Sequence, residues 1–153
     1  MARKRRPLKT AVITGGAGGL GRALTRALLA QGWSVAVLDL PGPELDEIAA
    51  LPVKTYACDV TDEQQTAEVC ARIIHDHPSI DLVIYNAGVT QIGLFAQTPL
   101  AAHRKVFAVN YFGAIHVAAA LLAAVRQARG VHLAISSVAG FSPLRRRAVY
   151  SAS

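Results

Sequence analysis

The sequence predicts an α/β domain built on a doubly wound parallel sheet in three layers, and three observations lead to this prediction. Short β-branched runs alternate along the chain with segments of helical periodicity, an order typical of parallel strands joined by crossover helices. The composition, 52% hydrophobic and 17% charged among 153 residues, fits a globular domain with a large buried interior. Polar or glycine-containing segments stand at the ends of the strand-like runs, where ligands bind in such sheets: TGGAGGLG, DL, DV, NAG and SSVAG.

The first strand is expected in KTAVIT (9–14), a run that ends in glycines, as buried parallel strands do before a tight turn. A helix follows and should end at Gly32. Its apolar residues recur at helical spacing: Leu20, Ala23, Leu24, Ala27 and Leu28. The second strand is expected in SVAVLDL (34–40), which stops at PGP.

The later elements continue the alternation. The third strand, VKTYAC (53–58), leads to a helix towards His75 that Thr61 or Asp62 can cap. The fourth strand, DLVIY (81–85), ends at NAG. Thr98 and Pro99, with the proline at the first helical position, should start a helix that runs to Gly130. The fifth strand is VHLAISS (131–137), which finishes at VAG.

The segment TGGAGGLG (14–21) joins the first strand to the first helix. Glycines there let the backbone turn tightly and approach a pyrophosphate, whose charge suits the free amides at a helix N-terminus. The segment follows a strand, opens a helix, and has Asp39 at the end of the next strand. That context fits the Rossmann-type dinucleotide-binding fingerprint.

Asp39 indicates which dinucleotide is bound. Its carboxylate can accept two hydrogen bonds from the hydroxyls of an adenosine ribose and would repel a 2′-phosphate. Leu40 and Pro41 follow it, rather than an arginine. The sequence therefore favours NAD, with NADP as the second choice.

At this point the chain resembles the short-chain dehydrogenase/reductase family over its whole length. The family's motifs match in order at these positions: TGxxxGxG at Thr14, Gly15, Gly19 and Gly21; NAG at Asn86, Ala87 and Gly88; the active-site asparagine at Asn110; SSxAG at residues 136–140; and the tyrosine of YxxxK at Tyr150. The family's serine lies thirteen residues before its tyrosine, which selects Ser137 over Ser136.

The resemblance implies an NAD(P)-dependent oxidoreductase that interconverts an alcohol and a carbonyl by hydride transfer. Tyr150 would be the general acid or base at the substrate oxygen, Ser137 would hold that oxygen by a hydrogen bond, and Asn110 would anchor a water that relays protons. Because a free phenol titrates at about pH 10, such a tyrosine needs a nearby positive charge to act as an acid or base at neutral pH. The family supplies it with a lysine four residues on, at position 154 of this numbering.

The resemblance also implies a set of cofactor-binding residues: Thr14, Gly15, Gly19, Leu20, Gly21, Asp39, Asp59, Val60, Asn86, Ala87 and Gly88. For some of them other roles stay open. Thr14 could stabilise the turn, Asn86 could steady the sheet beside the cofactor, and Asp59 could cap the next helix. Tyr85 stands where the family often has another asparagine, and we expect it to face the sheet.

The formal charge of +6 is concentrated in RKRR (3–6) and RRR (145–147), so the rest of the chain is almost neutral. No aromatic residue is interleaved with the first cluster, and residues 1–7 are therefore expected to form a basic, flexible terminus without nucleic-acid binding. The second cluster either forms a solvated loop or favours an acidic substrate. No histidine or cysteine has metal-ligand spacing, so no metal is expected.

We expect a cytoplasmic protein without membrane contact. The apolar run AVIT is too short for a signal peptide, and AIHVAAALLAAV (114–125) is too short to cross a bilayer and contains His116. Expected partners are a small-molecule alcohol or ketone and, because the helix 98–128 is rich in alanine on several sides, further copies in a homodimer or homotetramer.

Residues 1–153 are expected to form a single NAD-binding domain whose sheet is incomplete at its C-terminal edge. The resemblance implies two more strands and a substrate-covering segment beyond residue 153. The main alternative is a catalytically inactive nucleotide-binding module, and a weaker one is a regulator that binds nucleic acid through its basic N-terminus.

Overall fold

The structure is a computed structural model that describes residues 8–142 and 144–153, so the predicted flexible segment 1–7 lies outside the described residues. The strands are β1 (Thr10–Thr14), β2 (Ser34–Asp39), β3 (Lys54–Ala57), β4 (Leu82–Tyr85) and β5 (Val131–Ala134). The α-helices are α1 (Gly19–Ala30), α2 (Pro43–Ile48), α3 (Glu63–Asp76), α4 (Leu100–Phe107), α5 (Gly113–Ala128) and α6 (Ala148–Ala152). Short helical segments of other types are η1 (Phe95–Gln97), η2 (Ala108–Phe112) and η3 (Val138–Gly140).

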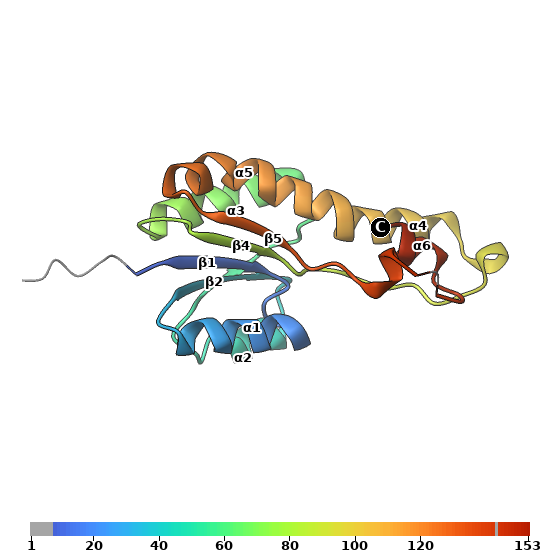
Figure 1. Ribbon diagram of the computed structural model, residues 1–153, viewed down its shortest axis with the longest axis horizontal. Helices are drawn as coiled ribbons and strands as arrows, with labels where there is room; N and C mark the ends of the chain where they lie inside the picture. The colour runs from blue at the N-terminus through green and yellow to red at the C-terminus, as the bar shows by residue number, and fades with distance from the viewer. Residues whose placement is uncertain (1–7, 143) are drawn as a thin grey trace, which may run out of the picture.

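The strands form one parallel sheet in the order β3-β2-β1-β4-β5. Figure 1 shows α1 and α2 on one face of this sheet and α3 and α5 on the other, so the domain has three layers. The predicted doubly wound α/β fold is confirmed. Because the strand order reverses between β1 and β4, a crevice for ligands is expected where these strands end.

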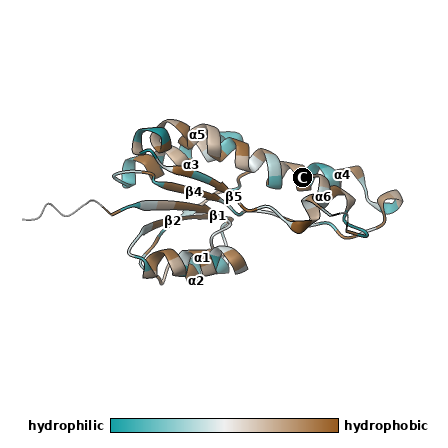
Figure 2. Ribbon diagram, viewed as in Figure 1, coloured by the Kyte–Doolittle hydropathy of each residue, from teal (hydrophilic) through white to brown (hydrophobic). Residues whose placement is uncertain are grey.

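The core consists of two apolar layers, one on each face of the sheet. Side chains alternate along a strand, so Val12 packs towards α3 and α5 while its neighbour Ile13 packs towards α1 and α2. Both are completely buried, as expected for a central parallel strand covered on both faces. Figure 2 shows hydrophobic residues concentrated along the central strands.

Helix α2 lies where the sequence pattern predicts no helix. Pro43 occupies one of its first positions, and Glu44 and Asp46 in the first turn complement the helix dipole. Its inward side chains, Leu45 and Ile48, are buried in the layer below the sheet. A helix of six residues is too short to produce a periodic apolar pattern, which is why it was not predicted.

Two helix starts were predicted with different success. Asp62 caps α3, because its side chain accepts a hydrogen bond from the Gln65 amide at 2.9 Å. The start at Thr98–Pro99 is wrong by one residue, since α4 begins at Leu100 and Pro99 is its cap. The Thr98 hydroxyl instead donates to the Leu94 carbonyl at 2.9 Å, within the turn formed by η1.

The long helix predicted to end near Gly130 runs continuously over Leu100–Ala128 and contains the π-helical segment η2. It has 29 residues, and the mean hydropathy of its most apolar window is 1.8. By length and composition this helix could cross a membrane, and the apolar stretch 114–125 considered in the sequence analysis is only part of it. The core helix of a soluble protein meets the same test. Here Val117, Leu121 and Val125 of α5 are buried in the layer that contains α3.

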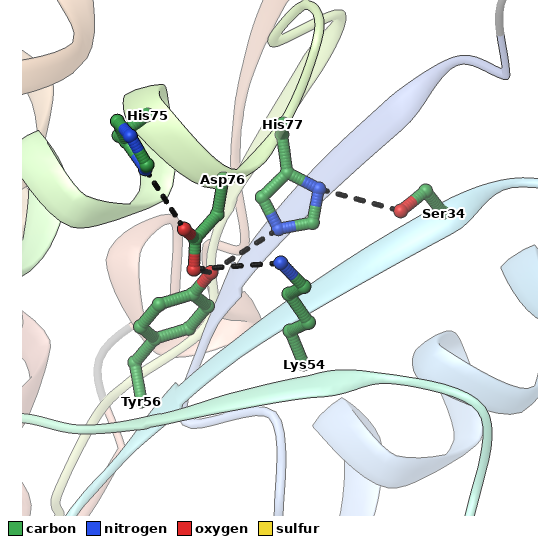
Figure 3. A network of polar contacts seen from close by, with 6 residues as sticks. All are labelled: Ser34, Lys54, Tyr56, His75, Asp76 and His77. Atoms are coloured by element: carbon green, nitrogen blue, oxygen red, sulfur yellow. Dashed lines mark hydrogen bonds and ion pairs between the residues drawn. The ribbon is translucent and has the colours of Figure 1, made fainter.

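A chain of polar contacts closes the amino end of the sheet (Figure 3). The Tyr56 hydroxyl donates to Asp76 Oδ2 at 2.8 Å, so its oxygen accepts from His77 Nε2, 3.3 Å away. His77 Nδ1 then accepts from the Ser34 hydroxyl at 3.3 Å. His77 is only 7% exposed, and in its neutral form it can make both of these hydrogen bonds, one as donor and one as acceptor. Lys54 adds an ion pair of 3.5 Å to Asp76.

This environment shifts two pKa values downwards. Burial, together with the charge of Lys54, lowers the pKa of His77 below its usual value. The hydrogen bond from Tyr56 lowers the pKa of Asp76 to about 2. Both groups therefore bind fewer protons in the folded protein than in the unfolded chain.

We expect acid to destabilise the protein in two stages. Stability should fall as the pH drops below about 6.5, where unfolded histidine gains a proton that His77 resists, and again below about pH 4 because of Asp76. His77→Gln should flatten the first stage when the thermal midpoint is measured by circular dichroism between about pH 7 and about pH 5. His75→Gln is the matched control, since the His75 side chain is 88% exposed. An unchanged slope in His77→Gln would contradict the assignment.

Candidate functional site

Two adjoining cavities lie at the carboxyl end of the sheet. The larger, about 780 Å³, is lined by the glycine turn after β1, by Asp39 at the end of β2, by Asp59 and Val60 after β3, and by residues 86–89 after β4. The smaller, about 420 Å³, is lined by Asn110, Ser137 and Tyr150 among others. Leu20 and residues 86–89 line both cavities, so a ligand in one would lie against the other.

Most of the predicted site residues meet at these cavities. The larger is lined by Gly15, Gly19, Leu20, Asp39, Asp59, Val60, Asn86, Ala87 and Gly88. The smaller is lined by the three predicted catalytic residues, Asn110, Ser137 and Tyr150. Thr14 and Gly21 line neither of the two. The roles of all these residues stay predictions, and the structure supplies their positions.

Close packing requires glycine at two positions of the turn. Gly15 has a φ of +63°, and a Cβ there would lie 2.8 Å from the Ala87 Cα atom. A Cβ on Gly21 would collide with the Gly15 carbonyl oxygen. The same carbonyl accepts a hydrogen bond of 2.9 Å from the Asn86 side chain. The turn is therefore pressed between α1 and the end of β4 and admits no side chain at these positions.

Gly19 differs, because a Cβ there would meet nothing within 4 Å, although the residue lines the larger cavity. Helix α1 begins at this glycine without a side-chain cap and without an acidic residue in its first turn. Its first amides are thus open to an anion. This end of the larger cavity therefore offers free amide donors of the kind that bind phosphate groups.

Asp39 is the last residue of β2 and lines the larger cavity. Its Oδ2 accepts from the Ala17 amide at 2.8 Å, and its Oδ1 accepts from the Leu40 amide at 2.9 Å. Each carboxylate oxygen can accept a second hydrogen bond. Within the part of the chain that the structure describes, Asp39 forms no ion pair, so its negative charge faces the cavity unopposed.

Asp59 shapes the wall after β3. Its Oδ1 accepts from both the amide and the hydroxyl of Thr61, at 2.9 and 2.8 Å. The alternative that Asp59 caps the next helix is wrong, because Asp62 does so. The neighbouring Val60 carbonyl accepts from His116 Nδ1 at 2.9 Å, which ties this wall to α5.

Thr14 and Asn86 join the ends of β1 and β4. The buried Thr14 hydroxyl oxygen accepts from the amides of Asn86 and Ala87, both at 3.1 Å. The Asn86 side chain donates to the carbonyls of Thr14 and Gly15. These contacts support the structural alternatives considered for both residues, although Asn86 also borders both cavities.

Asn110 lies within η2, the π-helical segment of the long helix. Its Oδ1 accepts from the Val89 amide at 2.8 Å, and its Nδ2 donates to the Val89 carbonyl at 3.0 Å and to Ser153 Oγ at 2.9 Å. Both amide hydrogens are therefore used. Asn110 links the long helix to the segment after β4 and to α6, and its predicted role in binding a water stays a prediction.

Tyr150 stands on α6, half-buried, with Val149 buried beside it. Ser137 Oγ accepts from the Ala139 amide at 3.2 Å and caps η3. Ser136 lines the smaller cavity as well, so the cavity does not distinguish the two serines. The choice of Ser137 stays a prediction from the family's spacing.

Tyr85 lies in β4, and its hydroxyl contacts His132 Nδ1 of the neighbouring strand at 2.6 Å. The two rings are stacked, with centroids 5.9 Å apart. Burial raises the pKa of Tyr85 to about 12, so this phenol stays protonated at neutral pH. Its contact across the sheet agrees with the expected orientation, although the residue also borders the smaller cavity.

Several lining residues were not predicted from the sequence. Lys105, Ala108 and Val109 contribute to the larger cavity from the long helix, and Thr90 contributes to the smaller one. The three helix residues share one face at positions i, i+3 and i+4, a spacing that could have indicated them. Among the described residues no cluster of histidine, cysteine and acidic side chains could hold a metal ion.

The two kinds of glycine lead to opposite predictions for stability. Gly21→Ala should lower the free energy of unfolding by about 1–3 kcal/mol, because its methyl group meets backbone that cannot move aside. Gly19→Ala, in open space, should leave the free energy of unfolding unchanged or slightly raised. Urea denaturation of both variants measures the difference. Equal losses would show that the steric argument fails.

Comparison with known proteins places the chain among short-chain dehydrogenases. A family model described as short chain dehydrogenase matches residues 9–153. An uncharacterized oxidoreductase of Staphylococcus epidermidis is 30% identical over 148 residues, which cover 94% of this chain and 64% of that protein. The 2-(R)-hydroxypropyl-CoM dehydrogenase of Xanthobacter autotrophicus is 33% identical over 156 residues, 95% of this chain and 62% of that protein.

Solved structures agree with these relatives. A short-chain dehydrogenase from Streptomyces avermitilis has a TM-score of 0.87 at 32% identity, and the match covers 95% of this chain and 55% of that one. An NAD⁺-bound xylitol dehydrogenase has a TM-score of 0.90 at 25% identity, over 97% and 60% of the two chains. ElxO with NADP bound has a TM-score of 0.88 at 25% identity, over 95% and 62%.

The chain thus spans less than two thirds of the length of the relatives it matches. Within that length the family match leaves out only the first eight residues. The glycine turn, the strand-end residues and the tyrosine helix, all described above, lie inside the matched region. This chain belongs to the short-chain dehydrogenase family.

Proposed function

We propose that this chain is the cofactor-binding and catalytic part of an NAD(P)-dependent oxidoreductase that interconverts an alcohol and a carbonyl. Its family membership supports an oxidoreductase in general. The observation that carries the finer proposal is the meeting of Tyr150, Ser137 and Asn110 around one cavity that shares a wall with the glycine-turn cavity. A substrate in the smaller cavity would lie against a cofactor in the larger one.

A nicotinamide dinucleotide is the cofactor class that the larger cavity fits. The open amides near Gly19 would hold the pyrophosphate, and Asp39 would accept hydrogen bonds from the adenosine ribose. One related structure holds NAD⁺ and another NADP, which supports the class. The unopposed charge of Asp39 favours NAD. Bound there, the nicotinamide would take up or supply the hydride.

The chain's own groups would handle the substrate oxygen and its proton. Tyr150 would donate a proton to the carbonyl oxygen during reduction, or remove it from the hydroxyl during oxidation. Ser137 would donate a hydrogen bond to the same oxygen and hold it within reach of the phenol. Both side chains border one cavity, so a single substrate oxygen could contact both.

Asn110 and Ser153 would keep Tyr150 in place. The Ser153 hydroxyl donates to the Tyr150 carbonyl at 3.0 Å and accepts from the Asn110 amide. This pair connects the tyrosine helix to the π-helical segment of the long helix, so a shift of either element would be transmitted to the phenol. π-helical segments occur often at functional sites.

We further propose that the full-length protein works as a soluble cytoplasmic homodimer or homotetramer in which residues 1–153 act as one domain. The outer side of the long helix supports an assembly, since it exposes large apolar side chains. Those that lie on η2 and α5 are Tyr111, Phe112, Ile115 and Leu122.

Asp39→Asn tests the cofactor preference. The change removes the charge but keeps the shape, so we expect NAD affinity to fall by about 10- to 100-fold while the loss for NADP is smaller. Isothermal titration of both dinucleotides against the full-length protein measures the ratio. Glu44→Gln on the nearby helix α2 is the charge-matched control. An unchanged ratio in Asp39→Asn would argue against ribose recognition by this carboxylate.

Tyr150→Phe tests the acid–base role. Loss of the hydroxyl should lower kcat by about 100- to 10,000-fold in the full-length protein. NAD affinity should change little, because Tyr150 lies outside the larger cavity. Tyr111→Phe, on the exposed side of the long helix, is the control and should retain activity. Full activity in Tyr150→Phe would sink the proposed mechanism.

A further inference from the structure

The loop before the tyrosine helix is joined to the segment after β4 at two points. The Gly93 amide donates to the Arg146 carbonyl at 2.9 Å. One residue on, Arg147 Nη1 donates to the Thr90 hydroxyl at 2.6 Å. Figure 1 shows the two segments side by side near α6, at the end of the molecule opposite the start of β1. Thr90 lines the smaller cavity, so Arg147, which does not itself line it, contacts a residue of the cavity wall.

Backbone hydrogen bonds fix the position of Arg147 in the chain. Its amide donates to the Leu144 carbonyl at 3.2 Å, and its own carbonyl accepts from the Ser151 amide at 2.8 Å, in the first turn of α6. The preceding Arg146 has a φ of +62°, a left-handed conformation that costs free energy outside glycine and turns the chain towards Thr90. The Arg147 guanidinium lies 6.0 Å from the centre of the Tyr150 ring. The backbone of Arg147 is thus fixed by the turn and by α6, and its side chain is positioned by Thr90.

Among the described residues, no carboxylate balances the charge of Arg147. No ion pair involves this residue in the described part of the chain. All ten acidic residues lie between Asp39 and Asp81, whereas seven lysines and arginines follow Asp81 and no acidic residue does. The remaining guanidinium donors therefore have no carboxylate partner among the described residues, and the guanidinium lies near the phenol that would meet the substrate.

We propose that Arg147 binds a carboxylate on the substrate whose alcohol or carbonyl group reacts at Tyr150. This inference rests on the proposed oxidoreductase function and names its substrate class, a short hydroxy acid or keto acid. A guanidinium can hold a carboxylate by two parallel hydrogen bonds, which fixes direction as well as position. Anchored at Arg147, the other end of a short substrate would be held beside Tyr150 and Ser137.

Pairs of substrates that differ only in charge test the proposal. Short 2- and 3-hydroxy acids and their primary amides, which have nearly the same shape, are offered to the full-length protein with NAD. We expect kcat/KM to be about 10- to 100-fold higher for the acid than for its amide. Arg147→Gln should remove this preference by lowering the value for the acid alone, and Arg147→Lys should restore part of it.

Arg145→Gln is the matched control, because Arg145 is exposed and carries the same charge two residues away. It should keep the preference for acids. The proposal is overturned if Arg147→Gln and the unaltered protein have the same acid-to-amide ratio, or if amides and uncharged alcohols are oxidised and the acids are not. A protein that binds no NAD, measured by titration, would instead refute the proposed function itself.

Discussion

The contact between the turn after β1 and the end of β4 is the constraint on which the site depends. Gly21 lets α1 approach the Gly15 carbonyl, and the Asn86 side chain binds that carbonyl from the other strand at 2.9 Å. Thr14 completes the junction through its hydroxyl. The segment that leaves this junction, residues 86–89, forms the common wall of both cavities. Its position therefore sets the distance between a bound dinucleotide and a bound substrate.

Polar groups have opposite roles at the amino ends and at the carboxyl ends of the parallel strands. At the amino ends of the strands, the side chains form a linear series of hydrogen bonds that contributes to stability: Ser34, His77, Tyr56 and Asp76. At the carboxyl ends, some groups have hydrogen-bonding capacity that the described residues do not use. These are Asp39, the first amides of α1 and the guanidinium of Arg147. Groups of that second kind are available for ligands.

How far the site could be predicted is best judged from particular residues. The strands, the glycine turn and Asp39 were predictable because each depends on a local pattern of residue types. Helix α2 and the start of α4 were missed or misplaced, since six residues carry no period and Thr98 bonds to the preceding turn instead. The sequence did not distinguish Asp59 from Asp62, because either carboxylate could have capped α3. The structure shows that Asp62 caps the helix and that Asp59 binds Thr61.

The sequence by itself determined the fold class, the order of the elements and the residues that meet at the carboxyl ends of the strands. Those residues could be predicted because parallel strands bring their carboxyl ends together whatever their length. Only the tertiary structure decided which groups are already occupied. Both amide hydrogens of Asn110 are engaged by Val89 and Ser153, whereas Arg147 contacts Thr90 and has no acidic partner among the described residues. These pairings join residues far apart along the chain, and no local pattern of residue types encodes a contact that the folding of distant segments creates.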